Sequence, residues 1–207
     1  MILEQKRHED RNEKTFSILI PSWNNLPFLQ LCIQSILKHS AYPHQIIVHV
    51  NDGSDGTLDW IRKQENIDYT WSKENIGVCY ALNAMRNLAT TNYLCFANDD
   101  MYLCPNWDRA LLDEIKLRKD DLFFYSGTLI EPTFSNNACA IAPQNFGSNP
   151  TEFQEEALLK ALPKLIKKDW AGATWPPNIV STRMWDLVGG YSTEFSPGMY
   201  SDPDFSK

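Results

Sequence analysis

Residues Tyr93–Met101 read YLCFANDDM, an apolar run that ends abruptly at two adjacent carboxylates. The turn-forming residues 90–92 (TTN) precede it, and this pattern is typical of a buried strand whose carboxyl end opens into a loop. In open parallel α/β sheets, ligands bind beyond the carboxyl ends of the strands. Asp99 and Asp100 are therefore expected either to meet a ligand there or to form a solvated turn.

The composition is that of one ordinary globular domain, with 207 residues, 43% of them apolar and 22% charged. A formal net charge of −7 disfavours a nucleic-acid-binding surface, which needs clustered Lys and Arg. A phosphorylated small molecule remains compatible if a metal ion supplies positive charge. The chain shows neither a signal-peptide core nor an apolar run that would cross a bilayer. We expect a cytoplasmic protein, with peripheral association at the inner face of the membrane left open.

The cysteines are five in number and scattered, without a C-x-x-C pair. Several of them lie in apolar runs, which favours reduced core residues of a cytosolic protein over disulfides or zinc ligands. They are Cys32, Cys79, Cys95, Cys104 and Cys139.

The first half of the chain alternates between strand and helix patterns. Strands are predicted over residues 16–20, 45–50, 67–71 and in the opening stretch, with helices over 25–39, 57–61 and 77–88 between them. This order predicts right-handed crossovers and a largely parallel, doubly wound α/β sheet with helices on both faces. Pro21 is expected to end the first strand, and the charged residues 1–15 to form a mobile leader.

The second half gives weaker signals. A short strand is predicted over 102–104, a helix from Asn106 to about Arg118, a strand over 122–130, a loop over 131–150, a helix over 152–162, and a helix from Ser181 or Thr182 that ends at Gly189 and Gly190. No internal repeat or linker interrupts residues 16–207, which we therefore expect to form a single domain.

Polar loops follow three of the predicted strands. They are PSWN at 21–24, NDGSDGT at 51–57 and NDDM at 98–101. Each is a weak signal, because NDGSDGT also suits a plain turn and Trp23 also suits a core. Their convergence at one edge of the sheet predicts a binding site.

Five motifs then carry a specific resemblance. IPSWNN, VNDGSDGT, ENIGVCYALN, FANDDM and GGYSTEFSPGMYSDPDF occur in this order over residues 16–205. Together they resemble glycosyltransferase family 2, the inverting enzymes of the A-type (GT-A) fold. The resemblance implies a Rossmann-like nucleotide-sugar-binding domain with a nucleotide-binding half (16–104) and an acceptor-side half (105–207).

The resemblance also implies roles for the donor-side residues. Trp23 would lie against the nucleotide base, where stacking is chemically sensible. Asp52 would accept a hydrogen bond from the ring N–H of uracil or thymine, so the donor would be a sugar linked to UDP or dTDP. Asn51 departs from the usual first Asp of that motif. Asn83 would lie near the donor.

The NDD stretch resembles the metal-binding D-x-D motif of the family. Asn98 stands at its first position, Asp99 would contact the ribose or sugar, and Asp100 would bind Mn²⁺ or Mg²⁺. The metal would bridge the two phosphates and stabilise the departing nucleoside diphosphate.

The catalytic base is assigned by resemblance to Asp202, in YSDPDF. Ser201 replaces the usual Glu, and Asp204 is a second acid close by, so both acids stay open as the base. The acceptor would be a saccharide, a lipid-linked group or a protein, in surface polysaccharide or glycoconjugate synthesis. The family usually continues beyond this motif, so we expect the chain ending at Lys207 to be either truncated or unusually small on the acceptor side.

Two alternatives come from other classes. A non-catalytic nucleotide-sugar-binding domain would keep Trp23, Asp52 and Asp100 without a complete acceptor site. A nucleotidyltransferase is disfavoured, because residues 21–27 (PSWNNLP) are neither Gly-rich nor basic, as a phosphate loop would be.

Overall fold

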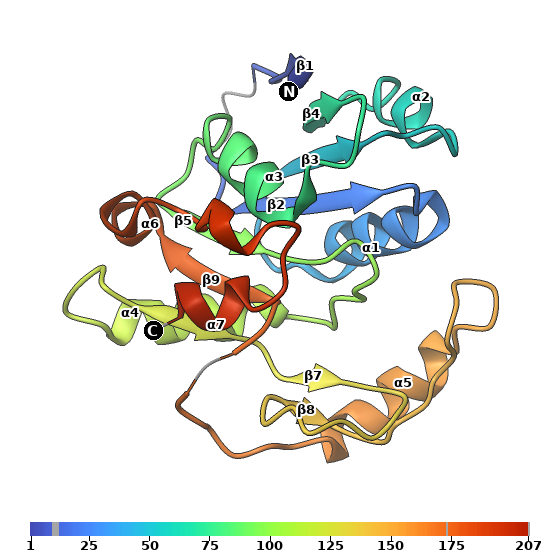
Figure 1. Ribbon diagram of the computed structural model, residues 1–207. Coiled ribbons are helices and arrows are strands. Elements are labelled where there is room, and N and C mark those ends of the chain that lie inside the picture. The colour runs from blue at the N-terminus through green and yellow to red at the C-terminus, as the bar shows by residue number, and fades with distance from the viewer. Residues whose placement is uncertain (10–12, 173, 207) are drawn as a thin grey trace.

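A central sheet of seven strands organises the computed structural model, which describes residues 1–9, 13–172 and 174–206 (Figure 1). In chain order the strands are β1 (Ile2–Lys6), β2 (Ser17–Trp23), β3 (Gln45–Asn51), β4 (Ile67–Ser72), β5 (Tyr93–Phe96), β6 (Phe124–Ser126) and β9 (Asn178–Ser181). Their order across the sheet is β1-β4-β3-β2-β5-β9-β6. Only β1 and β9 run against the common direction, which confirms the mostly parallel α/β sheet.

Helices cover both faces of this sheet. On one face lie α1 (Leu26–His39), α2 (Thr57–Ile61) and α4 (Trp107–Leu117), whose apolar side chains meet Ile18 and Ile20 of β2. On the other face lie α3 (Gly77–Arg86) and α6 (Thr182–Val188), which pack with Leu19 of the same strand. Alternate residues of β2 therefore enter different cores, as the period of a strand requires.

The predicted ends of two helices are confirmed. Pro27 lies in the first turn of α1, where its missing N–H costs no helical hydrogen bond. The Ser181 hydroxyl caps α6 by accepting the N–H of Met184 at 2.9 Å. Gly189 ends this helix in the left-handed conformation, with φ at 84°.

The amino-terminal residues are more ordered than the sequence predicted. Within the predicted mobile leader, Ile2–Lys6 form β1, which pairs antiparallel with β4. The Glu4 carboxylate accepts hydrogen bonds from Arg62 and from the Tyr69 hydroxyl. The prediction was wrong for this strand because an edge strand tolerates charged side chains on its solvent side. Residues 10–12 of the predicted leader lie outside the described residues.

Pro21 does not end the first strand. β2 continues to Trp23, and Pro21 stays in register with His49 of β3. The backbone groups of alternate residues point to the same side of a strand, so the missing N–H of Pro21 faces β5, as does the Leu19 carbonyl. The pairing of β2 with β5 ends at Leu19, so no ladder bond is lost.

The second half differs from prediction in several places, since residues 140–141 of the predicted loop form a strand and β9 was not predicted. Residues 102–104 are not a strand, and the predicted strand over 122–130 is divided into β6 and β7 (Leu129–Ile130). The division falls at Gly127, whose N–H donates to the Pro177 carbonyl at 2.8 Å. There the chain leaves the main sheet, and β7 pairs instead with β8 (Ala140–Ile141).

A small lobe lies below the main sheet in Figure 1. It contains β7, β8, α5 (Glu155–Ala161) and the 3₁₀ turn η1 (Leu162–Lys164). Glu155 attaches it to the end of α1, because Lys38 Nζ donates to its carboxylate at 2.7 Å and 2.8 Å. The Tyr102 hydroxyl donates to the same carboxylate.

The carboxyl-terminal part of the chain packs on the face of the sheet that α3 covers. The 3₁₀ turn η2 (Thr193–Phe195) and the short helix α7 (Ser201–Phe205) follow α6, and Phe195 and Phe205 pack on the core beneath α3. No helix in the described part of the chain is long and apolar enough to cross a membrane.

A buried carboxylate, Asp108, joins the start of α4 to the connection before β3. It is fully buried and accepts the N–H groups of Ala41 at 2.9 Å and Tyr42 at 2.8 Å, and His44 Nε2–H at 3.0 Å. Burial alone would raise the pKa of Asp108, but these donors outweigh it and lower the pKa. Burial lowers the pKa of His44, which favours its neutral ring.

Asp108→Ala is expected to lower the free energy of unfolding by roughly 3 kcal/mol, because it leaves buried donors without a partner. The matched control is Asp113→Ala on the same helix, where the side chain is exposed, and its effect should stay within about 0.5 kcal/mol. The Asp108 contribution is present above the carboxyl pKa of the unfolded chain and is lost as pH falls through the lower folded value. Urea denaturation at several pH values measures the free energy of unfolding of the two variants and its dependence on pH. Equal losses of this free energy in Asp108→Ala and Asp113→Ala would contradict the prediction.

Candidate active site

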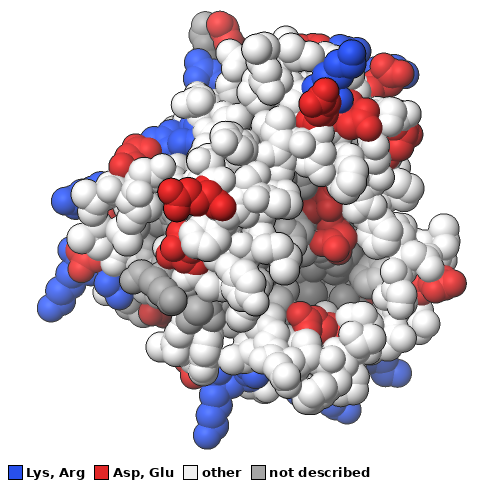
Figure 2. All heavy atoms as spheres, viewed as in Figure 1, with Lys and Arg blue, Asp and Glu red and all other residues white. Residues whose placement is uncertain are grey.

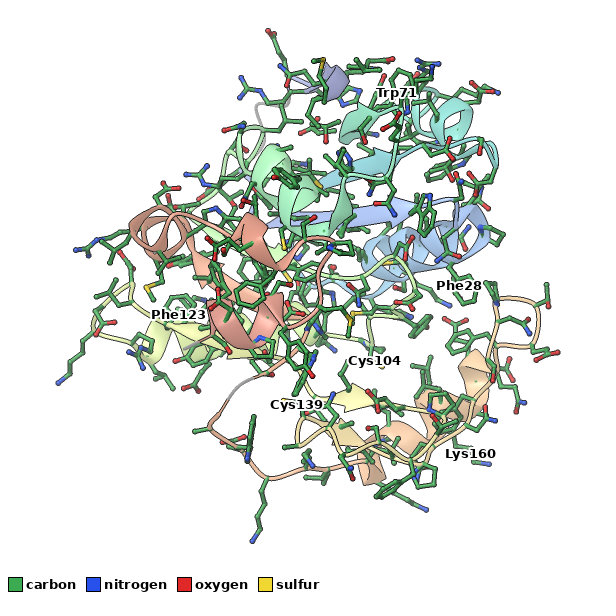
Figure 3. All side chains as sticks on the ribbon, in the orientation of Figure 1. Phe28, Trp71, Cys104, Phe123, Cys139 and Lys160 are labelled. Atoms are coloured by element: carbon green, nitrogen blue, oxygen red, sulfur yellow. The ribbon has the colours of Figure 1, made fainter. Side chains whose placement is uncertain are left out.

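An open cleft of about 1480 Å³ lies between the main sheet and the lobe. Asn98 and Asp100, which follow β5, line one wall, and Asp202 from α7 also lines the cleft. Figure 2 shows this face hollowed, with acidic side chains inside the hollow. Phe28 and Cys104 on the sheet side and Cys139 on the lobe side mark its two walls (Figure 3).

Trp23 and Asp52 lie side by side at the ends of β2 and β3. Trp23 pairs with Asn51 in register, and its side chain is 60% exposed, so it is not a core residue. Asp52 has a left-handed backbone, with φ at 63°, and its carbonyl accepts the Trp71 indole N–H at 2.8 Å. Neither side chain belongs to the described lining of the cleft. They therefore form a second, adjacent surface on the same edge of the sheet.

Two asparagines connect the loops after β2, β3 and β5. Asn24 Nδ2 donates to Asp52 Oδ2 at 2.9 Å, and Asn24 Oδ1 accepts the Gly53 N–H at 3.0 Å. Asn25 Nδ2 donates to Asp99 Oδ1 at 3.1 Å. The expected convergence of the three polar loops is therefore built from direct hydrogen bonds.

Asp99 and Asp100 are adjacent acids in partly dehydrated surroundings. Burial raises the pKa of Asp99 to about 6, and the neighbouring Asp100 charge adds to this, while the Asn25 amide opposes it. Asp100 is exposed to the cleft, yet desolvation by the cleft walls also raises its pKa. No Lys or Arg in the described part of the chain forms an ion pair with either carboxylate.

The Asn83 side chain, predicted to lie near the donor, is hydrogen-bonded to Tyr191. Its Nδ2 donates to the Tyr191 carbonyl at 2.8 Å, and its Oδ1 accepts the Tyr191 N–H at 3.0 Å. Both ends of the amide are thus engaged by one peptide segment, and Asn83 is absent from the described lining of the cleft. The structure connects it to the segment that leads to α7, and its place near the donor stays a prediction.

The structure distinguishes Asp202 from Asp204. Asp202 lines the cleft and accepts the Tyr191 hydroxyl at 3.0 Å, whereas Asp204 is exposed and does not belong to the described lining. Burial raises the pKa of Asp202 to about 6, and hydrogen bonding by Tyr191 opposes this rise. A carboxylate of this kind is ionised at neutral pH and is still basic enough to take a proton.

Several residues that shape the site were missed in the sequence. Asn24 and Asn25 follow Trp23 directly, but turns also favour asparagine, so their amides gave no distinct signal. Tyr191 reads as an ordinary aromatic after a Gly-Gly helix end. Only the fold brings its hydroxyl to Asp202, which lies 11 residues further along the chain.

The family model described as Glycosyl transferase family 2 matches residues 17–169. The chain belongs to glycosyl transferase family 2. This match includes the loops after β2, β3 and β5, and it confirms the family resemblance of the four motifs that lie within it. The fifth motif, at residues 189–205, lies beyond the matched range.

Curated relatives in this family are glycosyltransferases by name. A processive diacylglycerol beta-glycosyltransferase of Mycoplasma genitalium is 30% identical over 117 residues, which cover 53% of this chain and 34% of that protein. The putative teichuronic acid biosynthesis glycosyltransferase TuaG of Bacillus subtilis is 28% identical over 119 residues, which cover 54% of this chain and 45% of that one. The chain thus matches less than half the length of either relative.

Solved structures of glycosyltransferases share the fold. S. aureus TarS (residues 1–349) in complex with UDP has a TM-score of 0.60 at 15% identity, covering 93% of this chain and 54% of that one. The mannosyltransferase PcManGT of Pyrobaculum calidifontis, in complex with GDP-Man and Mn²⁺, has a TM-score of 0.60 at 16% identity, covering 98% of this chain and 54% of that one. The GT-A fold expected from the sequence is confirmed.

The paired acids have the chemistry of a divalent-cation site. Carboxylate oxygens suit Mg²⁺ and Mn²⁺, and Asp99 and Asp100 lack a cationic partner among the described residues. No group of three or more His, Cys, Asp or Glu side chains converges in the described part of the chain. The donor set therefore fits a cation that takes its remaining ligands from phosphate and water.

Asn24→Ala is expected to loosen the loop after β3, because both hydrogen bonds of its amide to Asp52 and Gly53 are lost. Amide hydrogen exchange at Gly53 should accelerate at least tenfold, since that N–H loses its acceptor. Ser54→Ala is the control, because it removes the hydroxyl contacts to Asp52 and to the Asn24 amide but leaves the acceptor of the Gly53 N–H in place. Unchanged exchange at Gly53 in Asn24→Ala would show that the loop is held by other contacts.

Proposed function

We propose that this protein is a metal-dependent, inverting glycosyltransferase that moves a sugar from a uridine or thymidine diphosphate sugar to an acceptor hydroxyl. The proposal rests chiefly on one observation, which is that Asp100 and Asp202 line the same cleft although they lie far apart in the sequence. Transfer to a hydroxyl needs a group that assists the leaving phosphate and a base that takes the acceptor proton. The two carboxylates supply one candidate for each task.

The donor would lie across the edge of the sheet. The exposed ring of Trp23 suits stacking on the base, and the Asp52 carboxylate suits the ring N–H of uracil or thymine. The TarS structures with UDP and UDP-GlcNAc support a uridine nucleotide. PcManGT holds GDP-Man, so guanosine donors are the comparison to test.

Asp202 would remove the proton of the acceptor hydroxyl. The acceptor oxygen forms its bond to the anomeric carbon as the carbon–phosphate oxygen bond breaks, and the electron pair of that bond leaves with the nucleoside diphosphate. Attack in line with the departing group inverts the anomeric centre. The raised pKa of Asp202, about 6, suits a base that works near neutral pH.

Asp100 would bind Mn²⁺ or Mg²⁺, whose charge would offset the two phosphates of the donor. Asp99 would contact the ribose or sugar of the donor, and Asn98 would lie beside it. Burial makes ionised Asp99 and Asp100 costly, and a bound cation would relieve that cost. The Mn²⁺ in the PcManGT complex supports this role.

The acceptor is proposed to be a saccharide or a lipid-linked group in surface polysaccharide or glycoconjugate synthesis. The names of the relatives, which mention teichuronic acid and diacylglycerol, support these two classes. All five cysteines are free thiols, which suits a reducing compartment. We therefore place the reaction in the cytoplasm, at the inner face of the membrane when the acceptor is a lipid.

A donor panel tests the proposal. UDP-, dTDP- and GDP-linked sugars are incubated with Mn²⁺ and saccharide or lipid acceptors, and released nucleotide and product are measured. Metal-dependent transfer from a uridine or thymidine donor is expected. Nucleotide binding without transfer or hydrolysis under any condition would favour the non-catalytic binding domain instead.

Asp100→Ala should remove the metal dependence of nucleotide binding. By calorimetry, the wild type is expected to bind UDP at least tenfold more tightly with Mn²⁺ than with chelator, while Asp100→Ala binds weakly in both. Glu131→Gln is the matched control, because it neutralises another carboxylate of the cleft wall. Equal affinity of the wild type with and without metal would contradict the metal role.

Asp202→Asn is expected to leave UDP affinity within a few-fold while transfer falls by about 10² to 10⁴, the usual contribution of a general base. Wild-type transfer should decline as pH falls through about 6, because a protonated Asp202 no longer accepts a proton. Asp204→Asn is the control and should behave as the wild type. The reverse pattern would assign the base to Asp204.

A further inference from the structure

The Tyr191 hydroxyl donates a hydrogen bond to the carboxylate of Asp202. It donates to Oδ1 at 3.0 Å, and Oδ2 has no such partner in the described part of the chain. Tyr191 is 2% exposed, and burial raises its pKa well above the usual value, so the phenol keeps its proton. The contact is therefore a hydrogen bond from a neutral phenol to a carboxylate.

Packing fixes the direction of this hydroxyl. The Tyr191 ring stacks on Phe205 with centroids 4.5 Å apart and planes inclined by 8°. Phe96 meets it edge-on at 5.9 Å, and Trp185 lies at 5.4 Å. Phe205 belongs to the same short helix as Asp202, so one ring positions both the helix and its carboxylate.

Asn83 fixes the backbone of Tyr191. Its side-chain amide pairs with the N–H and the carbonyl of that residue, as a neighbouring strand would. Gly190 allows this close approach, because a Cβ there would lie 2.4 Å from Asn83 Oδ1, and its φ is 78°. Asn83 therefore contacts Asp202 only through Tyr191.

Few other groups face Asp202. The Cys79 thiol on α3 is electrostatically coupled to it, and burial raises the pKa of Cys79, which keeps that thiol neutral. The Asn178 side chain on β9 helps to lower the pKa of Asp202, although its buried Nδ2 makes no hydrogen bond of good geometry with a described group. Asp204 on the same helix is exposed. No Lys, Arg or His in the described part of the chain forms an ion pair with Asp202.

We propose that Tyr191 is a positioning residue for the base, held in turn by Asn83. Its hydroxyl binds Oδ1 of Asp202, so that Oδ2 is left to accept the acceptor proton. The inference rests on the proposed function, and it gives Asn83 a role on the acceptor side of the reaction. A base held in one orientation needs no rearrangement when the acceptor hydroxyl arrives.

Tyr191→Phe removes the hydroxyl and keeps the ring. The carboxyl titration of Asp202 is followed by ¹³C NMR in labelled protein, with Asp202→Asn to assign the signal. Loss of the donor should raise the midpoint by about one pH unit, because hydrogen bonding to a carboxylate favours its charged form. Tyr93→Phe is the matched control, since it removes a hydroxyl from an aromatic residue of β5 that packs against Phe16 and Phe123 instead of Asp202.

Transfer kinetics supply the second measurement. In Tyr191→Phe, kcat should fall about tenfold while UDP affinity stays within twofold, and the acid limb of the pH profile should move upward with the NMR midpoint. Asn83→Asp, which keeps the acceptor for the Tyr191 N–H, should lower kcat in the wild-type background but add little in Tyr191→Phe, because both act through one hydroxyl.

The outcomes separate this inference from the proposed function. An unchanged midpoint in a folded Tyr191→Phe protein would overturn the positioning role, as would a shifted midpoint with unchanged kcat. Absence of transfer in the wild type would overturn the proposed function alone, because the NMR titration still decides whether Tyr191 governs Asp202. Additive losses for Asn83→Asp and Tyr191→Phe would exclude Asn83 from the arrangement.

Discussion

Two neighbouring asparagines hold the ligand-facing edge of the sheet together. Asn24 joins the loop after β2 to the loop after β3, and Asn25 joins it to the loop after β5. Both links are made by neutral amides, which bring no positive charge to the carboxylates of Asp52 and Asp99. Lys or Arg in these places would bind the acids more strongly but would cancel the charge that a ligand has to meet. The edge is thus fixed in geometry and left unbalanced in charge.

These carboxylates without a cationic partner destabilise the folded state, and other parts of the fold offset that cost. Asp99 and Asp202 are acids whose pKa values burial raises to about 6, which means that the folded chain holds their charged forms at a disadvantage. Such perturbed groups gather at functional sites. Two other features stabilise the folded state: the apolar packing on both faces of the sheet, and the buried Asp108 carboxylate with its hydrogen bonds. Stability and chemistry therefore depend on different parts of the molecule.

The sequence predicted the parallel sheet, its helices and the converging loops, because periodicity and turn residues are local signals. The prediction failed where the structure depends on contacts between residues that are far apart in the chain. β1 was not predicted from the sequence, because its charged residues suit an edge strand. Pro21 stays within β2, because the pairing of β2 with β5 ends at Leu19. Asn83 lies in a motif of the donor side, yet its amide is engaged by Tyr191, a partner that no local pattern reveals. Asp202 could be separated from Asp204 only by which of them reaches the cleft.

The position of β9 has a consequence for how this chain folds. β9 inserts between β5 and β6, so Phe96 pairs with Asn178 although most of the second half lies between them in sequence. Such long-range pairing carries a high loop-closure cost and slows folding. During synthesis, one edge of β5 stays open until β9 has emerged, and an open apolar edge invites pairing with other chains. Residues 16–104 therefore leave one edge of their last strand unpaired until β9 from the second half of the chain completes the sheet.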